Sequence, residues 1–325
     1  MLRMWYNMGW EQFKSLKLDP STEPRIKKSY SVTGDILSFQ ICPRQYGMYT
    51  HHGFHPAHMI QMWFGLTIHQ VLNKLNQQYT GVLDPSKKGQ VPSSDDVKQF
   101  FEHVTENLAD VGIRAINRHE KELALNVIQE FNRIEGPLLY PNIVETEYKF
   151  QSNLEHYILE GIVDVLKHSE TDKTPLPADF DNMEIWDYKA ARNPQVAQFG
   201  KKIDERKIEK YRYQMRVYAQ LYKLKTGKFP RCGRLYFMNE LMDKSPDGAK
   251  REKAIITLDF TKPEEFNKIK NAMDTFDATV KQIEHCCESD RWAPPKPEDI
   301  HDKDTCDGCD LRWNCSSVSY KPRFP

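Results

Sequence analysis

The chain has 325 residues, with 46 basic and 46 acidic side chains, which is enough for one large domain or two modest ones. The balanced charge excludes a globally basic nucleic-acid binder, so any nucleic-acid site must be recognised locally. No run of about 18 apolar residues exists and the N-terminus lacks the apolar segment of a signal peptide. We therefore expect a cytoplasmic protein without membrane association, whose seven cysteines lie in a reducing environment that favours metal binding over disulfide formation.

The first half of the sequence is predominantly helical. Residues 1–30 are polar with scattered aromatic side chains and have the composition of a connector, as expected if the chain is the C-terminal part of a longer protein. A helix is predicted over 31–45, with Thr33 as its cap and Pro43 near its end. Apolar residues at spacings of three and four predict further helices at 59–78, about 97–108 and 118–134, with a loop at 80–95.

The periodicity changes after residue 142. Strands are predicted at 143–150, 156–167 and 183–190, a helix at 209–226, strands at 234–239 and 254–259, and a helix at 262–284. This order predicts an α/β fold in which helices flank a mixed central sheet. We expect a core at 31–290 with a helical insertion at about 93–134, followed by a Cys-rich tail at 291–325.

Two of the predicted strands carry residues that could hold a divalent cation. Asp164 lies within the apolar segment GIVDVL, where a carboxylate is rarely left without a partner. Asp187 and Lys189 are two residues apart, so they share one face of a strand. Carboxylates from two strands could hold Mg²⁺ or Mn²⁺, and the lysine could orient and acidify the attacking water. The alternative is a salt bridge between Asp187 and Lys189 on an exposed edge strand.

Four segments together resemble the PD-(D/E)XK nuclease superfamily, and more narrowly its RecB-like branch. They are FGLTIHQVL with His69, GIVDVL with Asp164, WDYK with Asp187 and Lys189, and YQMRVYAQLY with Gln214 and Tyr218, in that order. The resemblance implies a restriction-endonuclease-like fold with Lys189 as the catalytic lysine. It also implies that the metal ligands are His69, Asp164, Asp187 and the main-chain carbonyl of Tyr188. Without the resemblance, a lone His69 on an amphipathic helix is more often structural.

Gln214 and Tyr218 are four residues apart and share a helix face. The resemblance implies that they contact DNA or support the metal site, whereas the alternative is a half-buried polar patch. A run of cations leads into this helix, and such runs usually form a solvated face. The candidates for contacts with DNA phosphates are Lys201, Lys202, Lys207, Lys210 and Arg212.

The cysteines form a second candidate site. Cys306, Cys309 and Cys315 lie within ten residues, and three thiolates can take one face of a cluster or of a tetrahedral metal site, which a fourth must close. One upstream cysteine, Cys42, with three C-terminal ones resembles the Fe–S subset of RecB-like nucleases, which includes AddB and CRISPR-associated exonucleases. That resemblance implies a structural [4Fe–4S] cluster. A zinc knuckle and unbound surface thiols are the alternatives. We expect no ligand among Cys232, Cys286 and Cys287, although they could substitute if Cys42 is not used.

The resemblance implies a metal-dependent deoxyribonuclease, expected to act as an exonuclease on single-stranded DNA or DNA ends. The pathway would be recombination, repair or CRISPR adaptation. The chain lacks a P-loop motif but is also similar to the nuclease module at the C-terminus of UvrD-like helicases, so a helicase or CRISPR adaptation proteins are expected partners. The alternative is a non-catalytic DNA-end-binding module that partners a helicase. A zinc-finger protein, the third possibility, would leave the carboxylates, His69 and Lys189 unexplained.

Overall fold

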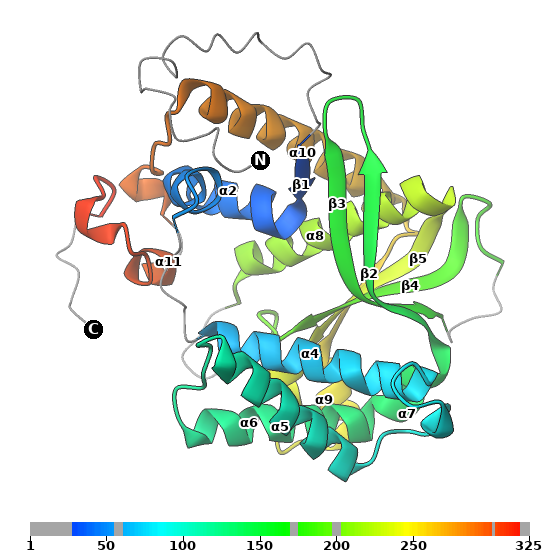
Figure 1. Ribbon diagram of the computed structural model, residues 1–325. Helices are drawn as coiled ribbons and strands as arrows, with labels where there is room; N and C mark the ends of the chain where they lie inside the picture. The colour runs from blue at the N-terminus through cyan, green and yellow to red at the C-terminus, as the bar shows by residue number, and fades with distance from the viewer. Residues whose placement is uncertain (1–27, 55–60, 170–174, 197–202, 301–302, 319–325) are drawn as a thin grey trace, which may run out of the picture.

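The computed structural model describes residues 28–54, 61–169, 175–196, 203–300 and 303–318. Within them, strands form one mixed sheet and helices cover both of its faces (Figure 1). The predicted fold class, a restriction-endonuclease-like mixed sheet flanked by helices, is confirmed. The strands are β1 (Ser29–Ser31), β2 (Ile143–Asn153), β3 (Ile158–His168), β4 (Phe180–Lys189), β5 (Phe229–Phe237) and β6 (Ile255–Asp259).

The long strand β3 organises the sheet. Along one edge it pairs with β2 to form an antiparallel hairpin. Its other edge is shared, because β1 pairs with its first residues in parallel and β4 pairs with its last residues in antiparallel. The sheet then continues from β4 to β5 in parallel and from β5 to β6 in antiparallel.

The shared edge of β3 creates a fork. Pairing between β3 and β4 ends at Val165 and Trp186. Asp164 and Asp187 are the next residues on the two strands, at the point where the strands separate. An antiparallel ladder would place them directly opposite each other, where two like charges are destabilising. The fork therefore gathers two carboxylates at one point of the fold.

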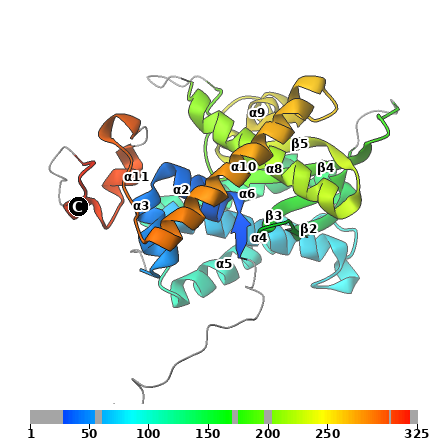
Figure 2. The same cartoon turned by 90° about the horizontal axis from the view of Figure 1, so that it is seen from above.

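Two helical layers enclose the sheet (Figure 1, Figure 2). One layer packs on a core that includes Ile185, and contains α8 (Glu205–Thr226), α10 (Pro263–Ser289), η1 (Val32–Leu37), α2 (Ser38–Ile41), α3 (Pro43–Tyr46) and η2 (Gly47–His51). The other packs on a core that includes Trp186, and contains α4 (Gln61–Thr80), α5 (Ser94–Asp110), α6 (Arg118–Ile134), α7 (Gly136–Leu139) and α9 (Asp247–Ala254). The side chains of β4 alternate between the two cores, as the period of a strand requires.

Short helices complete the described chain: η3 (Pro85–Lys87), η4 (Tyr140–Asn142), η5 (Met238–Met242), η6 (Pro297–Asp299), α11 (Lys303–Asp307) and η7 (Arg312–Asn314). Among the helices of the described ranges, none combines the length and the hydrophobicity needed to cross a membrane.

The predicted helix at 31–45 is confirmed over 32–41 and 43–45, whereas Ser31 ends a strand and Cys42 separates two helical segments. The sheet begins at Ser29, two residues before the predicted start of the core, and short helical segments follow it. Ser31, rather than Thr33, caps the first of them: its Oγ accepts from the Gly34 N–H at 3.1 Å, and its own N–H donates to Asp35 Oδ2 at 2.7 Å. The free edge of β3 explains the difference, because pairing there outweighs local helical preference.

The Cys-rich tail lies against the N-terminal helices, as both ribbon views show (Figure 1, Figure 2). Trp292 packs on Tyr46, with ring centroids 6.0 Å apart. It also lies over Gly47, where an added Cβ would be 2.1 Å from the indole ring. The Asp310 N–H donates to Tyr49 Oη at 3.3 Å. The two ends of the described chain therefore meet on one side of the sheet.

Gly161, at the start of the GIVD segment, allows α8 to pack closely on β3. An added Cβ would lie 2.9 Å from Tyr218 Cε1 and 3.0 Å from Leu221 Cδ1, both of which are core side chains. We expect Gly161→Ala to lower the free energy of unfolding by about 1–3 kcal/mol because the core is overpacked. Urea denaturation measures this change.

Gly248→Ala is the matched control, since Gly248 lies in α9 and an added Cβ there meets nothing within 4 Å. It should not lower the stability. If the two variants were equally stable, close packing at Gly161 would not be required.

Candidate active site

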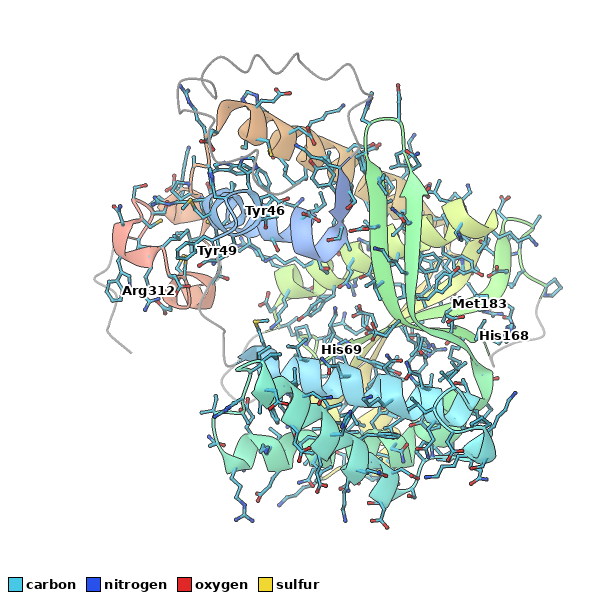
Figure 3. All side chains as sticks on the ribbon, in the orientation of Figure 1. Tyr46, Tyr49, His69, His168, Met183 and Arg312 are labelled. Carbon is cyan, nitrogen blue, oxygen red and sulfur yellow. The ribbon has the colours of Figure 1, made fainter. Side chains whose placement is uncertain are left out.

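A pocket of about 420 Å³ opens at the fork between β3 and β4. Its lining residues come from both helical layers, because α4 lies in one layer and α8 in the other. Figure 3 labels His69, which α4 contributes. The residues lining it are His69, Glu147, Ile162, Asp164, Asp187, Tyr188, Lys189, Ala190, Ala191, Tyr211, Gln214 and Tyr218. The structure thus brings together the predicted metal ligands, the predicted catalytic lysine, and the Gln214/Tyr218 pair.

The Asp164 carboxylate links α4 to β4. One oxygen, Oδ1, is 3.1 Å from His69 Nδ1. The other, Oδ2, accepts a 2.6 Å hydrogen bond from the main-chain N–H of Tyr188. In a continued ladder that N–H would face a carbonyl of β3. The carboxylate replaces the lost ladder bond and fixes the width of the fork.

Asp187 and Lys189 form a buried network with Gln214 on α8. Lys189 Nζ lies 2.5 Å from Asp187 Oδ2 and donates to Gln214 Oε1 at 2.8 Å. Gln214 Nε2 donates to Asp187 Oδ1 at 2.8 Å and to Tyr218 Oη at 3.0 Å. Lys189 Nζ also lies 4.8 Å from the centre of the Tyr211 ring. A single glutamine therefore orients both the carboxylate and the lysine.

The alternative of an exposed edge salt bridge is wrong. β4 is an inner strand, paired with both β3 and β5, and Asp187 is only 4% exposed. Burial raises the pKa of the Asp187 carboxyl, while the Lys189 ammonium opposes that rise. A carboxylate in this position needs compensating positive charge.

Gln214 and Tyr218 are buried, with exposed fractions of 3% and 4%. The contacts described here are to side chains of the site, so their predicted contact with DNA stays a prediction. Arg212 is half-buried, with Nη1 3.9 Å from Glu209 Oε2. Lys207 and Lys210 are exposed on the first turns of α8. The predicted Lys201 and Lys202 lie outside the described residues.

The sequence reasoning missed Glu147. Thr146 pairs with Val165 and Tyr148 with Val163, so Glu147 lies opposite Asp164 in the hairpin. Ligand atoms of His69, Glu147 and Asp164 all lie within 4.8 Å of one another. No motif marks this residue, but pairing the two predicted strands around their shared turn would have placed it beside Asp164.

The site is rich in negative charge. Burial would lower the pKa of His69, but the neighbouring Asp164 carboxylate outweighs it and raises that pKa to about 9. Partial burial, and then Asp164, raise the pKa of Glu147 to about 7. Carboxylate oxygens and an imidazole nitrogen can all ligate divalent cations, so His69, Glu147, Asp164 and Asp187 are the residues that could hold one.

Comparison with known proteins identifies the family. The sequence profile of the PD-(D/E)XK nuclease superfamily matches residues 33–316, which include the fork and α8. The chain belongs to the PD-(D/E)XK nuclease superfamily. A search of the curated proteins finds no match.

Comparison with solved structures finds proteins whose fold is similar to that of this chain. A crystal structure from Eubacterium rectale, of a protein that bears the provisional name of exonuclease, superposes with a TM-score of 0.50 at 13% identity. The match covers 98% of this chain and 95% of that one. A second structure, of SSO0001, has a TM-score of 0.28 at 12% identity, covering 88% of this chain and 98% of that one.

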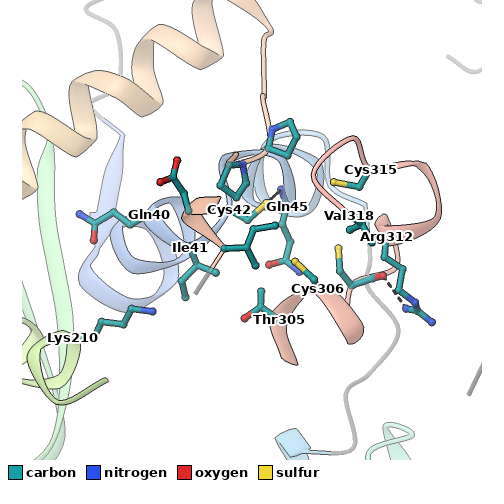
Figure 4. A pocket seen from close by; sticks show the side chains of 15 residues that line it. Gln40, Ile41, Cys42, Gln45, Lys210, Thr305, Cys306, Arg312, Cys315 and Val318 are labelled. Atoms are coloured by element: carbon teal, nitrogen blue, oxygen red, sulfur yellow. Dashed lines mark hydrogen bonds between the residues drawn. The ribbon is translucent and has the colours of Figure 1, made fainter. Parts of the chain in front are cut away.

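A second pocket, of about 130 Å³, lies between the N-terminal helices and the tail (Figure 4). The four predicted cysteines line it: Cys42, Cys306, Cys309 and Cys315. Burial, and then the neighbouring sulfurs, raise the pKa of the Cys306 thiol. In contrast, Cys232 is buried in β5, and Cys286 and Cys287 lie on α10 outside this lining.

The spacing of these sulfurs is informative. Among the described residues, the groups of His, Cys, Asp and Glu whose ligand atoms converge within 4.8 Å include no set of three cysteines. A tetrahedral zinc site, with Zn–S bonds of about 2.3 Å, would bring its sulfurs to about 3.8 Å from one another. In every set of three of these four sulfurs, at least one pair is therefore more than 4.8 Å apart in this structure, a wider spacing than a zinc site has.

Cation binding to the nuclease site should strengthen with pH. A cation binds deprotonated ligands, and the pKa values of about 9 for His69 and about 7 for Glu147 mean that both hold protons at about pH 6 in the metal-free folded state. Both values are raised above those of the unfolded chain. The two groups therefore favour the folded state at low pH, and that contribution is lost as the pH rises through about 7 and then about 9.

We expect the rise in melting temperature caused by excess Mg²⁺ to be larger at about pH 8.5 than at about pH 6. Differential scanning calorimetry at both pH values measures it, with Asp164→Asn as the control that should show little rise at either. An equal rise at the two pH values would contradict the proton competition.

Proposed function

We propose that this PD-(D/E)XK nuclease is a divalent-cation-dependent deoxyribonuclease that removes nucleotides from single-stranded DNA or DNA ends. The observation that carries the proposal is the convergence of His69, Asp164, Asp187 and Lys189 on one pocket at the fork of the sheet. Three different elements supply them, and Gln214 orients two of them through hydrogen bonds. A degenerate, non-catalytic DNA-end binder would have no need of this buried arrangement.

His69, Asp164, Asp187 and the carbonyl of Tyr188 would hold Mg²⁺ or Mn²⁺. When bound, such a cation supplies Lewis-acid activation of water and neutralises charge on the phosphodiester. Lys189 can orient the attacking water through Nζ and stabilise the negative charge that develops on the water oxygen as it loses a proton. Gln214 keeps Nζ pointed into the pocket, and the Tyr211 ring covers it. Positioning of this kind, rather than covalent chemistry, is what hydrolysis of a phosphodiester needs.

The burial of Asp187 supports a flexible substrate. Asp187 is almost fully buried, at a pocket lined by residues of the β2–β3 hairpin and α8, so a scissile phosphate has to approach it past these elements. A single strand or a frayed end can bend into such a space, whereas an intact duplex is stiff over this length. Lys207 and Lys210 lie on the exposed first turns of α8 and are suited to hold the phosphates that follow. The provisional name of the Eubacterium rectale protein supports exonucleolytic action.

The proposal extends to a [4Fe–4S] cluster held by Cys42, Cys306, Cys309 and Cys315. Its support is that four sulfurs from the two ends of the sequence line one pocket, with a spacing wider than that of a zinc site. A cubane cluster spaces its sulfurs further apart than a single ion does. This feature also favours the Fe–S subset of RecB-like nucleases. The role of the cluster would be structural, and a helicase or CRISPR adaptation proteins remain proposed partners in repair or adaptation.

The catalytic proposal predicts a large loss of activity on removal of Lys189 or Asp187. With labelled single-stranded DNA and Mn²⁺, we expect Lys189→Met and Asp187→Asn to reduce the rate at least 10²–10³-fold, on the order of the loss of a transition-state donor. Lys121→Ala, at an exposed position on α6, should digest DNA at the wild-type rate. Activity of the two site variants equal to that of the control would defeat the proposed chemistry.

The cluster proposal predicts a brown protein. An anaerobic preparation should absorb broadly at about 400 nm and contain four irons per chain. Cys42→Ser and Cys315→Ser should lose both the colour and the iron. Cys286→Ser should keep them, because Cys286 lies on α10 away from the pocket. A folded, colourless anaerobic preparation with one zinc per chain would replace the cluster with a zinc site.

A further inference from the structure

A group of metal-ligating side chains lies outside both the nuclease pocket and the cysteine pocket. His51 ends η2, His52 follows it, and Asp290 is the C-cap of α10. Ligand atoms of the three residues all lie within 4.8 Å of one another. We propose that they form a binding site for Zn²⁺ that links η2 to the end of α10. This site stands apart from the proposed nuclease reaction.

The donor atoms suit zinc. Imidazole nitrogens and carboxylate oxygens are common zinc ligands, and a site with three protein ligands leaves the fourth position to water. With metal–ligand bonds of about 2.0–2.2 Å, two ligands of a tetrahedral zinc lie about 3.3 Å apart. His52 Nε2 is 3.0 Å from Asp290 Oδ1, so this pair already has nearly the separation that the metal requires.

A surface ion pair does not account for the whole group. The side chains of His52 and Asp290 are 38% and 65% exposed, and an ion pair with that exposure contributes little stability. It also gives no reason for His51 to converge on the same point. The ring centroids of the two histidines are 5.0 Å apart, so two protonated imidazoles would repel each other there. A shared metal ion instead binds both rings in their neutral form.

Trp292 orients two of the three ligands. Its indole N–H donates to Asp290 Oδ1 at 3.3 Å, and its ring centroid lies 5.2 Å from that of His51. The indole itself packs on Tyr46 and over Gly47. Hydrogen bonds to a ligating carboxylate and packing of a ligating ring fix the ligands before the metal binds. The proposed site is therefore built on the contact that joins the two ends of the described chain.

A zinc ion at this position has a structural role. Its ligands come from segments that are far apart in the sequence, and the folded chain brings them together. The unfolded chain has no such preformed site, so zinc binds the folded state in preference and stabilises it. The ion would hold the start of the tail against η2 without using the cysteine pocket.

The test counts zinc by elemental analysis after equilibrium dialysis at a fixed concentration of free Zn²⁺. His52→Ala and Asp290→Asn should each bind one Zn²⁺ per chain fewer than the wild type, and each should show a smaller rise in melting temperature with Zn²⁺. Asparagine tolerates the left-handed backbone of Asp290, whose φ is +48°, so this variant keeps the end of α10. His103→Ala, the same change at an exposed position on α5, is the matched control and should bind as much zinc as the wild type.

X-ray absorption at the zinc edge identifies the ligands of the ion that is lost. The difference between the wild type and His52→Ala should show nitrogen and oxygen neighbours at about 2.0–2.2 Å and no sulfur at about 2.3 Å. Equal zinc counts in these two proteins would overturn the site, and a sulfur neighbour would assign the lost ion to the cysteines instead. An equal loss in His103→Ala would also overturn it, because any exposed histidine would then bind zinc as well.

Discussion

The hydrogen bond from the Tyr188 N–H to the Asp164 carboxylate is the interaction on which the site depends. It occurs where the β3–β4 ladder ends, and it satisfies a main-chain donor that the ladder no longer reaches. Pairing of β1 with the first residues of β3 directs that edge away from β4. A continuous ladder would leave no space between Asp164 and Asp187. The site thus forms because the pairing between β3 and β4 ends at Val165 and Trp186, before it reaches the two aspartates.

Helix α8 joins this fork to the rest of the molecule. Gly161 lets it approach β3, and its inner face then brings Gln214 into hydrogen-bonding contact with Asp187 and Lys189. One turn earlier, Lys210 lines the cysteine pocket. Tyr211, the next residue, covers Lys189. The first turns of one helix therefore contribute residues to both pockets.

Local sequence patterns predicted most of the fold and the centre of the site. The period of two placed Asp187 and Lys189 on one face, and the periods of three and four gave the long helices within a few residues of their ends. These patterns depend only on near neighbours. The motif segments gave the order of the site along the chain, and the structure brings those residues together in one pocket.

What the sequence could not give depends on contacts between distant segments. β1 has only three residues, and it exists because an edge of β3 is free. The position of Glu147 beside Asp164 follows from the register of the hairpin, which no motif encodes. Its left-handed φ is likewise imposed by the tertiary structure. Residues of this kind become visible only after the strands are paired.

The two ends of the described chain are held together by apolar packing rather than by a polar network like that of the nuclease site. Trp292 packs where Gly47 leaves space for it, and this contact brings the tail beside α3 before any metal is considered. A cluster bound by Cys42 and the tail cysteines would close a loop that contains nearly the whole catalytic core. Closing so long a loop is entropically costly in the unfolded chain, so such a cluster binds the folded state in preference. Its binding free energy then adds to the stability of the fold, and it does so without contacting the reacting phosphate. A cluster in this position would therefore stabilise the fold that holds the nuclease pocket, without taking part in the reaction there.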